Sequence, residues 1–519
     1  MSRTWPGMLA LGVLSVTACE QEPEALPPLG AALIVIDTDA PVPRLVGNVR
    51  LDLYRPDGTW FYSETISRAE PITWPVSFGI VNPSETEAST ILVRVRGFAD
   101  NKVRDYRGER FIEPVAADAQ PDACLSPDVT ENLRLIVEDD AGEPLDLTPL
   151  EEPLPRTSID ALAEVNLAPG IAGRASIFLA GDCFGREVDL LGRRTCVSGE
   201  YAPVERMELE PDTTTPSTTQ IGTWPPGDRT CGQTPPTASE GLFDDQVCVD
   251  GGAFLLGDPG SFGFGVFDAF PEAVAVLPPL FVDRYEVTVG RFRQALASGL
   301  LDAVAPPRIN DGTYADAPTV NASENCTFST DPRGREEFPL NCVSWDTARA
   351  FCRAAGGDLP TEAQWEWIAA AAERPRQTRF PFGDDAPSCG AVVYSRVPDA
   401  LSETLECFPD ERWGPSRVDF GSDETASGVV GMGGNVREWT LDEHHPYCGS
   451  CWDAAPLEDP RCTGLGGDVR TVRGGDWTSP VELLRAGARN EGFAAAIDDA
   501  DGVRVGFRCV YPVPVDPIE

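Results

Sequence analysis

Basic residues are scarce in this chain. Its 519 residues include 41 lysines and arginines against 83 aspartates and glutamates, a net charge of −42. Lys102 is the only lysine. A protein that binds the phosphates of nucleic acid, or an anionic membrane surface, needs clustered cations. The charge balance therefore argues against nucleic acid as a partner. It favours an exported protein that its own charge keeps soluble.

Histidine is nearly absent, since His444 and His445 are the only two in the chain. There are fifteen cysteines, and Cys448-x-x-Cys451 followed by Cys462 could form a zinc or redox motif. No second CxxC motif accompanies it, so we favour disulfides, which are the usual state of cysteine in an exported chain. Within the N-terminal half, we expect Cys183 and Cys196 to close a loop.

Long apolar runs are also missing, and the one at the N-terminus is too short to cross a bilayer. Residues 1–19 have an arginine, an apolar run and small residues, the pattern of a signal peptide. The run ends in Val-Thr-Ala-Cys and resembles the bacterial lipobox, which predicts lipidation of Cys19. A plain secretory signal is the alternative. We expect a bacterial cell-envelope protein, in the periplasm or at the outer membrane, held to the membrane only by this anchor.

Turn-rich composition divides the rest of the chain. After a tether at residues 20–30, short alternating strands and turns such as Pro56-Asp57-Gly58 predict an all-β sandwich of immunoglobulin-like, antiparallel type over residues 31–204. Residues 205–245 contain Pro/Thr-rich stretches and predict a linker. A second domain then covers residues 246–512. We find no catalytic constellation in the first domain.

Helix signals are local and specific in the second domain. Thr288 and Ser344 are placed as N-caps. The helix that Ser344 begins should end at Gly356-Gly357, where glycine suits the left-handed C-terminal position. Thr361 and Gln364 predict a capping box, and the tryptophans that follow are expected in the core.

Eight short motifs occur in a set order in this domain. They are GGAFLLGD (251–258), FVDRYEVTVGRF (281–292), VSWDTARAFC (343–352), LPTEAQWEW (359–367), FPFG (380–383), GNVREW (434–439), VRGGDW (472–477) and GFRC (506–509). Together they resemble the formylglycine-generating enzyme, or sulfatase-modifying factor, family. The resemblance implies an irregular α+β fold similar to C-type lectins. It says nothing about residues 20–240.

The family's enzymes use two cysteines after the RGGS-type motif to bind copper(I) and oxidise a substrate cysteine to formylglycine. In this chain those positions fall at Ser479 and at Leu483 or Leu484. A hydroxyl or an alkyl group cannot replace a soft thiolate at Cu(I), so we expect neither copper nor that reaction. Related sulfoxide synthases hold iron through an added histidine-rich helical domain, for which this chain has no counterpart.

The resemblance also implies disulfides and an ion. It pairs Cys352 with Cys509, and we add Cys326–Cys342 and Cys389–Cys407 as further pairs. The family's calcium site uses main-chain carbonyls and one glutamate, at positions that correspond here to Gly431, Gly434, Val436 and Glu438. Glycine at 431 departs from the family's usual Asp or Asn, so calcium and a simple Glu438 salt bridge stay open as alternatives. A second family calcium site lacks its asparagine at residues 391–397.

Three functions are compatible with these observations. The first is a non-catalytic module that binds a surface protein or glycan. The second is an oxidoreductase that uses a different site, with Asp476, Arg485 or Arg489 lining the former cleft. The third is a structural envelope component. The missing copper cysteines favour the first.

Overall fold

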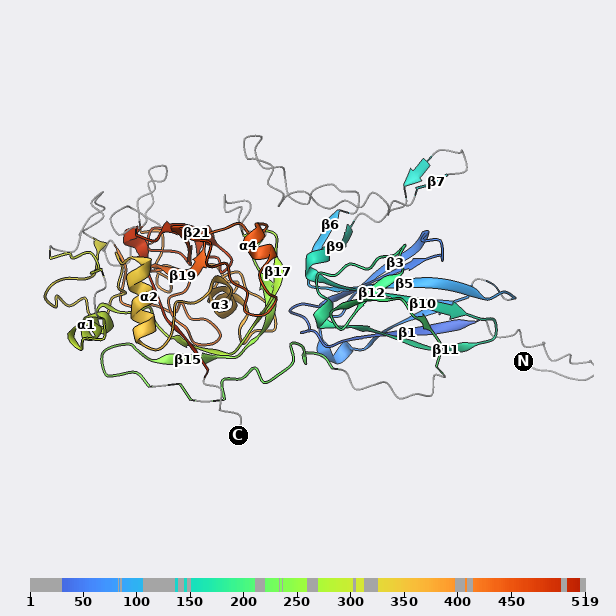
Figure 1. Cartoon of the computed structure of the whole chain (residues 1–519), viewed down its shortest axis with the longest axis horizontal. Coiled ribbons are helices and arrows are strands. Elements are labelled where there is room, and N and C mark those ends of the chain that lie inside the picture. Colours follow the sequence, from blue (N-terminus) through green and yellow to red (C-terminus); the bar gives the residue numbers. More distant parts are fainter. Residues whose placement is uncertain are drawn as a thin grey trace, which may run out of the picture.

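The computed structural model describes residues 30–513, apart from 83, 85, 106–135, 139–143, 147–150, 211–219, 233, 236, 259–268, 302–304, 312–324, 397–406, 408–413 and 496–501. Lipidation of Cys19 and the tether at residues 20–30 thus fall almost entirely outside the described residues. Figure 1 shows two domains side by side, one rich in strands and one with short helices and many loops. None of the described helices has the length and apolar character that a membrane span requires.

Two sheets enclose the core of the first domain. One has the order β11-β1-β4 and the other β14-β10-β5-β2-β3. Their strands are β1 (Ala31–Thr38), β2 (Asn48–Tyr54), β3 (Trp60–Ser67), β4 (Val76–Val81), β5 (Ser89–Phe98), β10 (Ser158–Leu167), β11 (Ala172–Leu179) and β14 (Arg206–Met207). Alternate residues of β1 are buried, as the period of a half-buried strand requires. Ile34, Val93 and Ile177 meet in one cluster that joins both sheets.

Strand direction departs from the expected antiparallel arrangement. β1 pairs with β11 in parallel, and β10 pairs with β14 in parallel. The hairpin predicted at Pro56-Asp57-Gly58 is present, because β2 and β3 pair antiparallel around it. The prediction of an antiparallel sandwich is therefore wrong for these two pairs, because long connections bring β11 beside β1, whereas the other pairs of both sheets are antiparallel. The immunoglobulin-like type stays a prediction.

The first domain also contains three two-stranded sheets among the described residues. They pair β6 (Val103–Asp105) with β9 (Glu151–Pro153), β7 (Ile136–Glu138) with β8 (Pro144–Asp146), and β12 (Arg194–Val197) with β13 (Glu200–Pro203). The Cys183–Cys196 disulfide, predicted as a loop closure, ties β12 to the end of β11.

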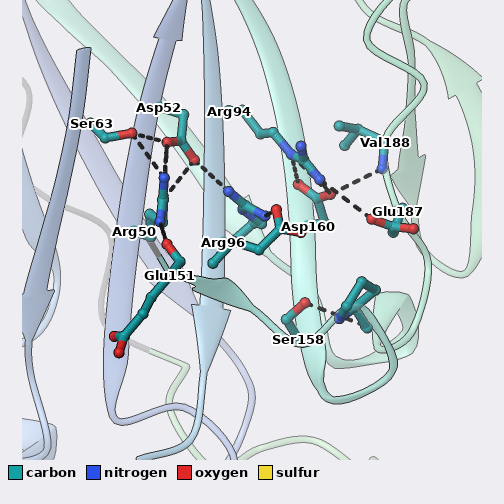
Figure 2. Close-up of polar contacts among 12 residues, drawn as sticks. Arg50, Asp52, Ser63, Arg94, Arg96, Glu151, Ser158, Asp160, Glu187 and Val188 are labelled. Atoms are coloured by element: carbon teal, nitrogen blue, oxygen red, sulfur yellow. Dashed lines mark hydrogen bonds and ion pairs between the residues drawn. The ribbon is translucent and has the colours of Figure 1, made fainter. Parts of the chain in front are cut away.

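The face of the larger sheet that points away from the core carries buried charges (Figure 2). Arg96 donates to Asp52 at 2.7 Å and to Glu152 at 3.0 Å, and Arg94 binds both carboxylate oxygens of Asp160. Each of these side chains is almost fully buried. Every cation faces an anion, which is the condition for burying charge without a large desolvation penalty. We therefore interpret this network of buried ion pairs as a structural feature of the sheet.

Residues 220–245, in the predicted linker, contact both domains. Trp224 is 3 % exposed and packs with Leu45 of the first domain and with Leu255 of the second. A disulfide joins Cys231 to Cys248. Across the interface, Lys102 Nζ lies 2.5 Å from Glu272, and the Arg44 guanidinium lies over the ring of Trp367. The Pro/Thr-rich part at 211–219 lies outside the described residues.

The second domain is built from short elements. Its sheets are β15 (Gln246–Val249) with β18 (Leu280–Asp283) and β23 (Val510–Pro512), β16 (Gly252–Leu256) with β17 (Ala273–Leu277), and the order β21-β20-β19-β22. The last four are β19 (Arg437–Glu443), β20 (Val469–Arg473), β21 (Arg489–Phe493) and β22 (Val505–Gly506). The helices are α1 (Val289–Ala297), α2 (Trp345–Ala354), α3 (Glu362–Glu366) and α4 (Ser450–Asp453). This mixed, loop-rich architecture agrees with the expected α+β class.

The predicted helix caps are formed. The hydroxyls of Thr288 and Ser344 accept backbone N–H groups in the first turns of α1 and α2. Thr361 and Gln364 make both bonds of the capping box. α2 ends at Ala354, and Gly356 follows with a φ of 92°. In α3, Trp365 is fully buried, and its indole N–H donates to Glu438 of β19.

Disulfides join segments that are distant in sequence. The structure contains Cys352–Cys509, Cys326–Cys342 and Cys389–Cys407, the three pairs expected for this domain. Cys462 of the candidate metal motif is bonded to Cys451. Cys448 is disulfide-bonded as well. These cysteines therefore stabilise loops and do not form a thiolate metal site.

Candidate functional site

The glycine turn before β19 is held by an ion pair at the centre of the second domain. Glu438 is 1 % exposed, and both of its carboxylate oxygens accept from Arg508, at 2.6 Å for Oε1 and 2.8 Å for Oε2. The indole N–H of Trp365 donates to the same carboxylate at 2.8 Å. Arg508 also donates to the Val430 carbonyl, just before the turn. Glu438 therefore joins β19, α3 and the C-terminal segment.

Two further carboxylates lie against this turn. Glu286 is 0 % exposed, and its Oε1 accepts from the Asn435 amide at 2.9 Å. Asp423 is 3 % exposed, and its Oδ2 accepts the N–H groups of Gly433 and Gly434. Their other oxygens, Glu286 Oε2 and Asp423 Oδ1, are buried without a hydrogen-bond partner.

Glycine is required where the carboxylates approach the backbone. A Cβ atom at Gly431 would lie 2.9 Å from Glu286 Oε2, and one at Gly433 would lie 2.9 Å from Asp423 Oδ2. Gly431 also has a φ of 78°, which side chains rarely adopt. The carboxylate of Glu286 thus occupies the space that a side chain at residue 431 would fill.

The cluster carries more negative than positive charge. Glu286, Asp423 and Glu438 face the single guanidinium of Arg508. Burial raises the pKa of Glu286 to about 8, although Arg508 opposes the shift. Burial likewise raises the pKa of Asp423 to about 6, against the hydrogen bonds from Gly433 and Gly434. Such a site favours a bound cation or retained protons.

These observations define how a calcium ion would fit. The predicted residues Gly431, Gly434, Val436 and Glu438 do lie together, in the turn and the start of β19. Glu438, however, is already neutralised by Arg508. The unpartnered oxygens belong to Glu286 and Asp423, and carboxylate oxygens are ligands that calcium prefers. Sequence reasoning missed both residues, because nothing in the sequence places 286 and 423 beside 431.

Packed side chains occupy the positions at which the family resemblance places the copper cysteines. Ser479 is 1 % exposed, and its hydroxyl accepts the N–H of Asp476. Leu484 is 0 % exposed and packs with Phe380, Val392 and Tyr394. Leu483, the other candidate for the second position, is half-buried beside it. No cysteine lies at any of these three positions.

The three residues suggested as alternatives for a different catalytic cleft lie in different surroundings. Asp476 is 0 % exposed and pairs with Arg437 at 2.8 Å. Arg489 is 2 % exposed and donates to Glu362. Arg485 pairs with Asp258 in a cavity between the domains. Asp476 and Arg489 are thus buried in ion pairs, whereas Arg485 lines the cavity between the domains, and an oxidoreductase with a different site stays a prediction.

Fold and site together define a loop-rich domain braced by a buried Glu–Arg pair and disulfides. Residues 232–513 match the family described as the sulfatase-modifying factor enzyme 1-like domain. The match covers more than half of the chain, which therefore belongs to this family.

Relatives include formylglycine-generating enzymes and hercynine oxygenases. A formylglycine-generating enzyme of Streptomyces coelicolor is 28 % identical over 295 residues, which cover 51 % of this chain and 88 % of the relative. A hercynine oxygenase of Mycolicibacterium thermoresistibile is 31 % identical, over 29 % of this chain and 32 % of the relative. Among solved structures, PvdO from Pseudomonas aeruginosa has a TM-score of 0.38 and 22 % identity, over 54 % of this chain and 99 % of that one.

Proposed function

We propose that this chain is a lipid-anchored envelope protein whose sulfatase-modifying-factor-like domain is a non-catalytic module that binds a protein or glycan. One observation carries the proposal. At the family's copper positions, Ser479 is hydrogen-bonded to the backbone and Leu484 lies in an apolar cluster. Neither can coordinate Cu(I), which prefers thiolates. On this proposal, the domain belongs to the family but lacks the thiolates of its oxidising site.

Binding and oxidation can be separated in one set of assays. The purified full-length chain is screened against a glycan array and against a cysteine peptide with oxygen, each with and without added Cu(I). Saturable binding without consumption of the peptide supports a binding module. Oxidation of the peptide would support the alternative of an oxidoreductase with another site. If neither binding nor oxidation is detected, the alternative of a structural envelope component is supported.

The anchor is tested separately. Mass spectrometry of the mature N-terminus should find Cys19 carrying acyl groups, because one chain alone gives only marginal membrane binding. An unmodified N-terminus elsewhere would refute lipidation and leave the binding-module proposal untouched.

Calcium belongs to the same proposal, as a structural ion. Glu286 Oε2 and Asp423 Oδ1 would supply its carboxylate ligands, next to the carbonyls of the glycine turn. When bound, the ion would supply charge compensation at this turn. The ion pair of Glu438 and Arg508 holds the same turn.

A further inference from the structure

A pocket lined by three arginines, the arginine pocket, lies in the second domain beside α2 and β20. It has a volume of about 520 Å³. Its lining consists of Trp345, Arg349, Leu441, Glu443, Arg461, Thr463, Gly464, Gly466 and Arg470. Three of these are arginines and only one is a carboxylate, in a chain where acids outnumber bases two to one. Arginines therefore outnumber carboxylates in the pocket lining, although the chain as a whole is acidic.

The carboxylate of the pocket is already in use. Glu443 is 2 % exposed and accepts the backbone N–H groups of Leu465, Gly466 and Gly467, at 2.8 Å, 3.2 Å and 2.9 Å. The nearest nitrogen of Arg470 is 3.5 Å away from it. Glu443 thus binds the glycine loop more closely than it binds the arginine.

Two arginines keep unused hydrogen-bonding capacity. Arg470 Nε is buried and has no hydrogen-bond partner. Arg461 is about half exposed, and its nearest carboxylate, Asp459, is 3.9 Å away. Both guanidinium groups therefore lie in the pocket lining with only long ion-pair contacts, and their N–H groups can donate to an incoming anion.

The guanidinium groups are also held in place before any ligand arrives. Arg470 lies 4.2 Å and Arg349 lies 5.1 Å from the centre of the Trp345 ring. Asp358 fixes Arg349 by two hydrogen bonds, at 2.9 Å and 3.0 Å. The Trp345 indole donates to the Thr440 carbonyl. Pre-ordered side chains lower the entropic cost of binding.

We propose that this pocket binds the carboxylate or sulfate group of an acidic sugar. The inference rests on the proposed function of the domain as a binding module. A guanidinium fork matches such an oxyanion, and the volume lies in the range of small-molecule sites. The Thr463 hydroxyl and the exposed loop at Gly464 and Gly466 offer neutral groups to sugar hydroxyls. The distant acidic residues are largely screened beyond ~8 Å at physiological salt, so a short saccharide is not repelled.

Calorimetry with the full-length chain tests the proposal. The probes are three disaccharides of equal size: one with a uronate carboxylate, one with a sulfate and one neutral. We expect an acidic disaccharide to bind, more weakly at high salt, and the neutral one not to bind. Arg470→Gln should weaken binding roughly tenfold or more, as the loss of a charge-assisted bond implies. Arg461→Gln should weaken it in the same direction.

Arg417→Gln is the matched control, because Arg417 is half exposed and lies outside the pocket. Thermal unfolding curves establish that each variant is folded, and the exposed Arg461 variant serves if the Arg470 variant is not. Comparison of the carboxylate and sulfate probes identifies which group is preferred. Equal binding of acidic sugars to both pocket variants, or none to the wild type, would overturn the inference. Binding of only neutral sugars or proteins would overturn it while sustaining the binding module.

Discussion

At the scale of single residues, the Glu438–Arg508 pair is the central brace of the second domain. Both side chains are buried, and removal of one leaves the other charge without a partner. Glu438→Ala should therefore lower the free energy of unfolding by about 3–5 kcal/mol. Denaturant titrations measure it in calcium and in chelator. Equal losses are expected, since Arg508 already neutralises Glu438. A much larger loss in calcium would show that Glu438 is itself a ligand.

Glu286 should govern a pH dependence of stability. Its pKa is about 8 in the folded chain and ordinarily 4.5, so the folded state holds the proton more tightly. The resulting stabilisation is complete below about pH 4.5 and is lost as the pH rises through about 8. In chelator, the unfolding midpoint of the wild type should fall over this range, and calcium should reduce the fall.

Glu286→Gln should flatten this pH profile and remove the effect of calcium on it. Glu458→Gln, at an exposed carboxylate, is the control and should leave the profile unchanged. A Glu286→Gln profile that matches the wild type would contradict our assignment of the pH dependence to Glu286.

At the scale of elements, the Cys352–Cys509 disulfide should contribute more to the free energy of unfolding than the disulfides that close short loops. Cys352 and Cys509 are separated by 157 residues, which the chain-entropy model converts to about 5 kcal/mol before strain is subtracted. Replacing both cysteines with alanine should lower the melting temperature far more than the same change at Cys451 and Cys462, 11 residues apart. Equal effects would show that strain or residual structure dominates.

Elements with local signals could be predicted from the sequence, and those set by distant contacts could not. The caps of α1, α2 and α3 depend on residues within four positions, so Thr288, Ser344 and Thr361 were sufficient. β10 reads SIDALAEVNL, where alanines weaken the strand pattern, and it is held by pairing with β5. The parallel partnership of β1 and β11 joins residues about 140 apart.

The candidate site shows the same division. Sequence motifs placed the glycine turn and Glu438 beside each other, and the copper positions stay a prediction from the family resemblance. Glu286, Asp423 and Arg508 meet that turn only through folding, so their role could not be read from spacing. The arginine pocket was missed for the same reason, because α2, β20 and the loop at 461–466 supply its residues separately.

At the scale of the whole molecule, the two domains should unfold together. Trp224 is buried among residues of both domains, and Lys102 pairs with Glu272 across the interface. Trp224→Ala should cost about 3–5 kcal/mol and separate one calorimetric transition into two. A single unshifted transition in this variant would contradict a role for residue 224 in coupling the domains.

The central claim is that this chain lacks the oxidising chemistry of its family. The most direct test is to measure whether it forms formylglycine. The full-length chain is incubated with Cu(I), oxygen and a sulfatase-type cysteine peptide, beside the Streptomyces coelicolor formylglycine-generating enzyme as positive control. Mass spectrometry then quantifies the aldehyde. We predict conversion by the control and none by this chain, because Ser479 and Leu484 provide no thiolates. Formylglycine produced by this chain would contradict the proposal that its domain is non-catalytic.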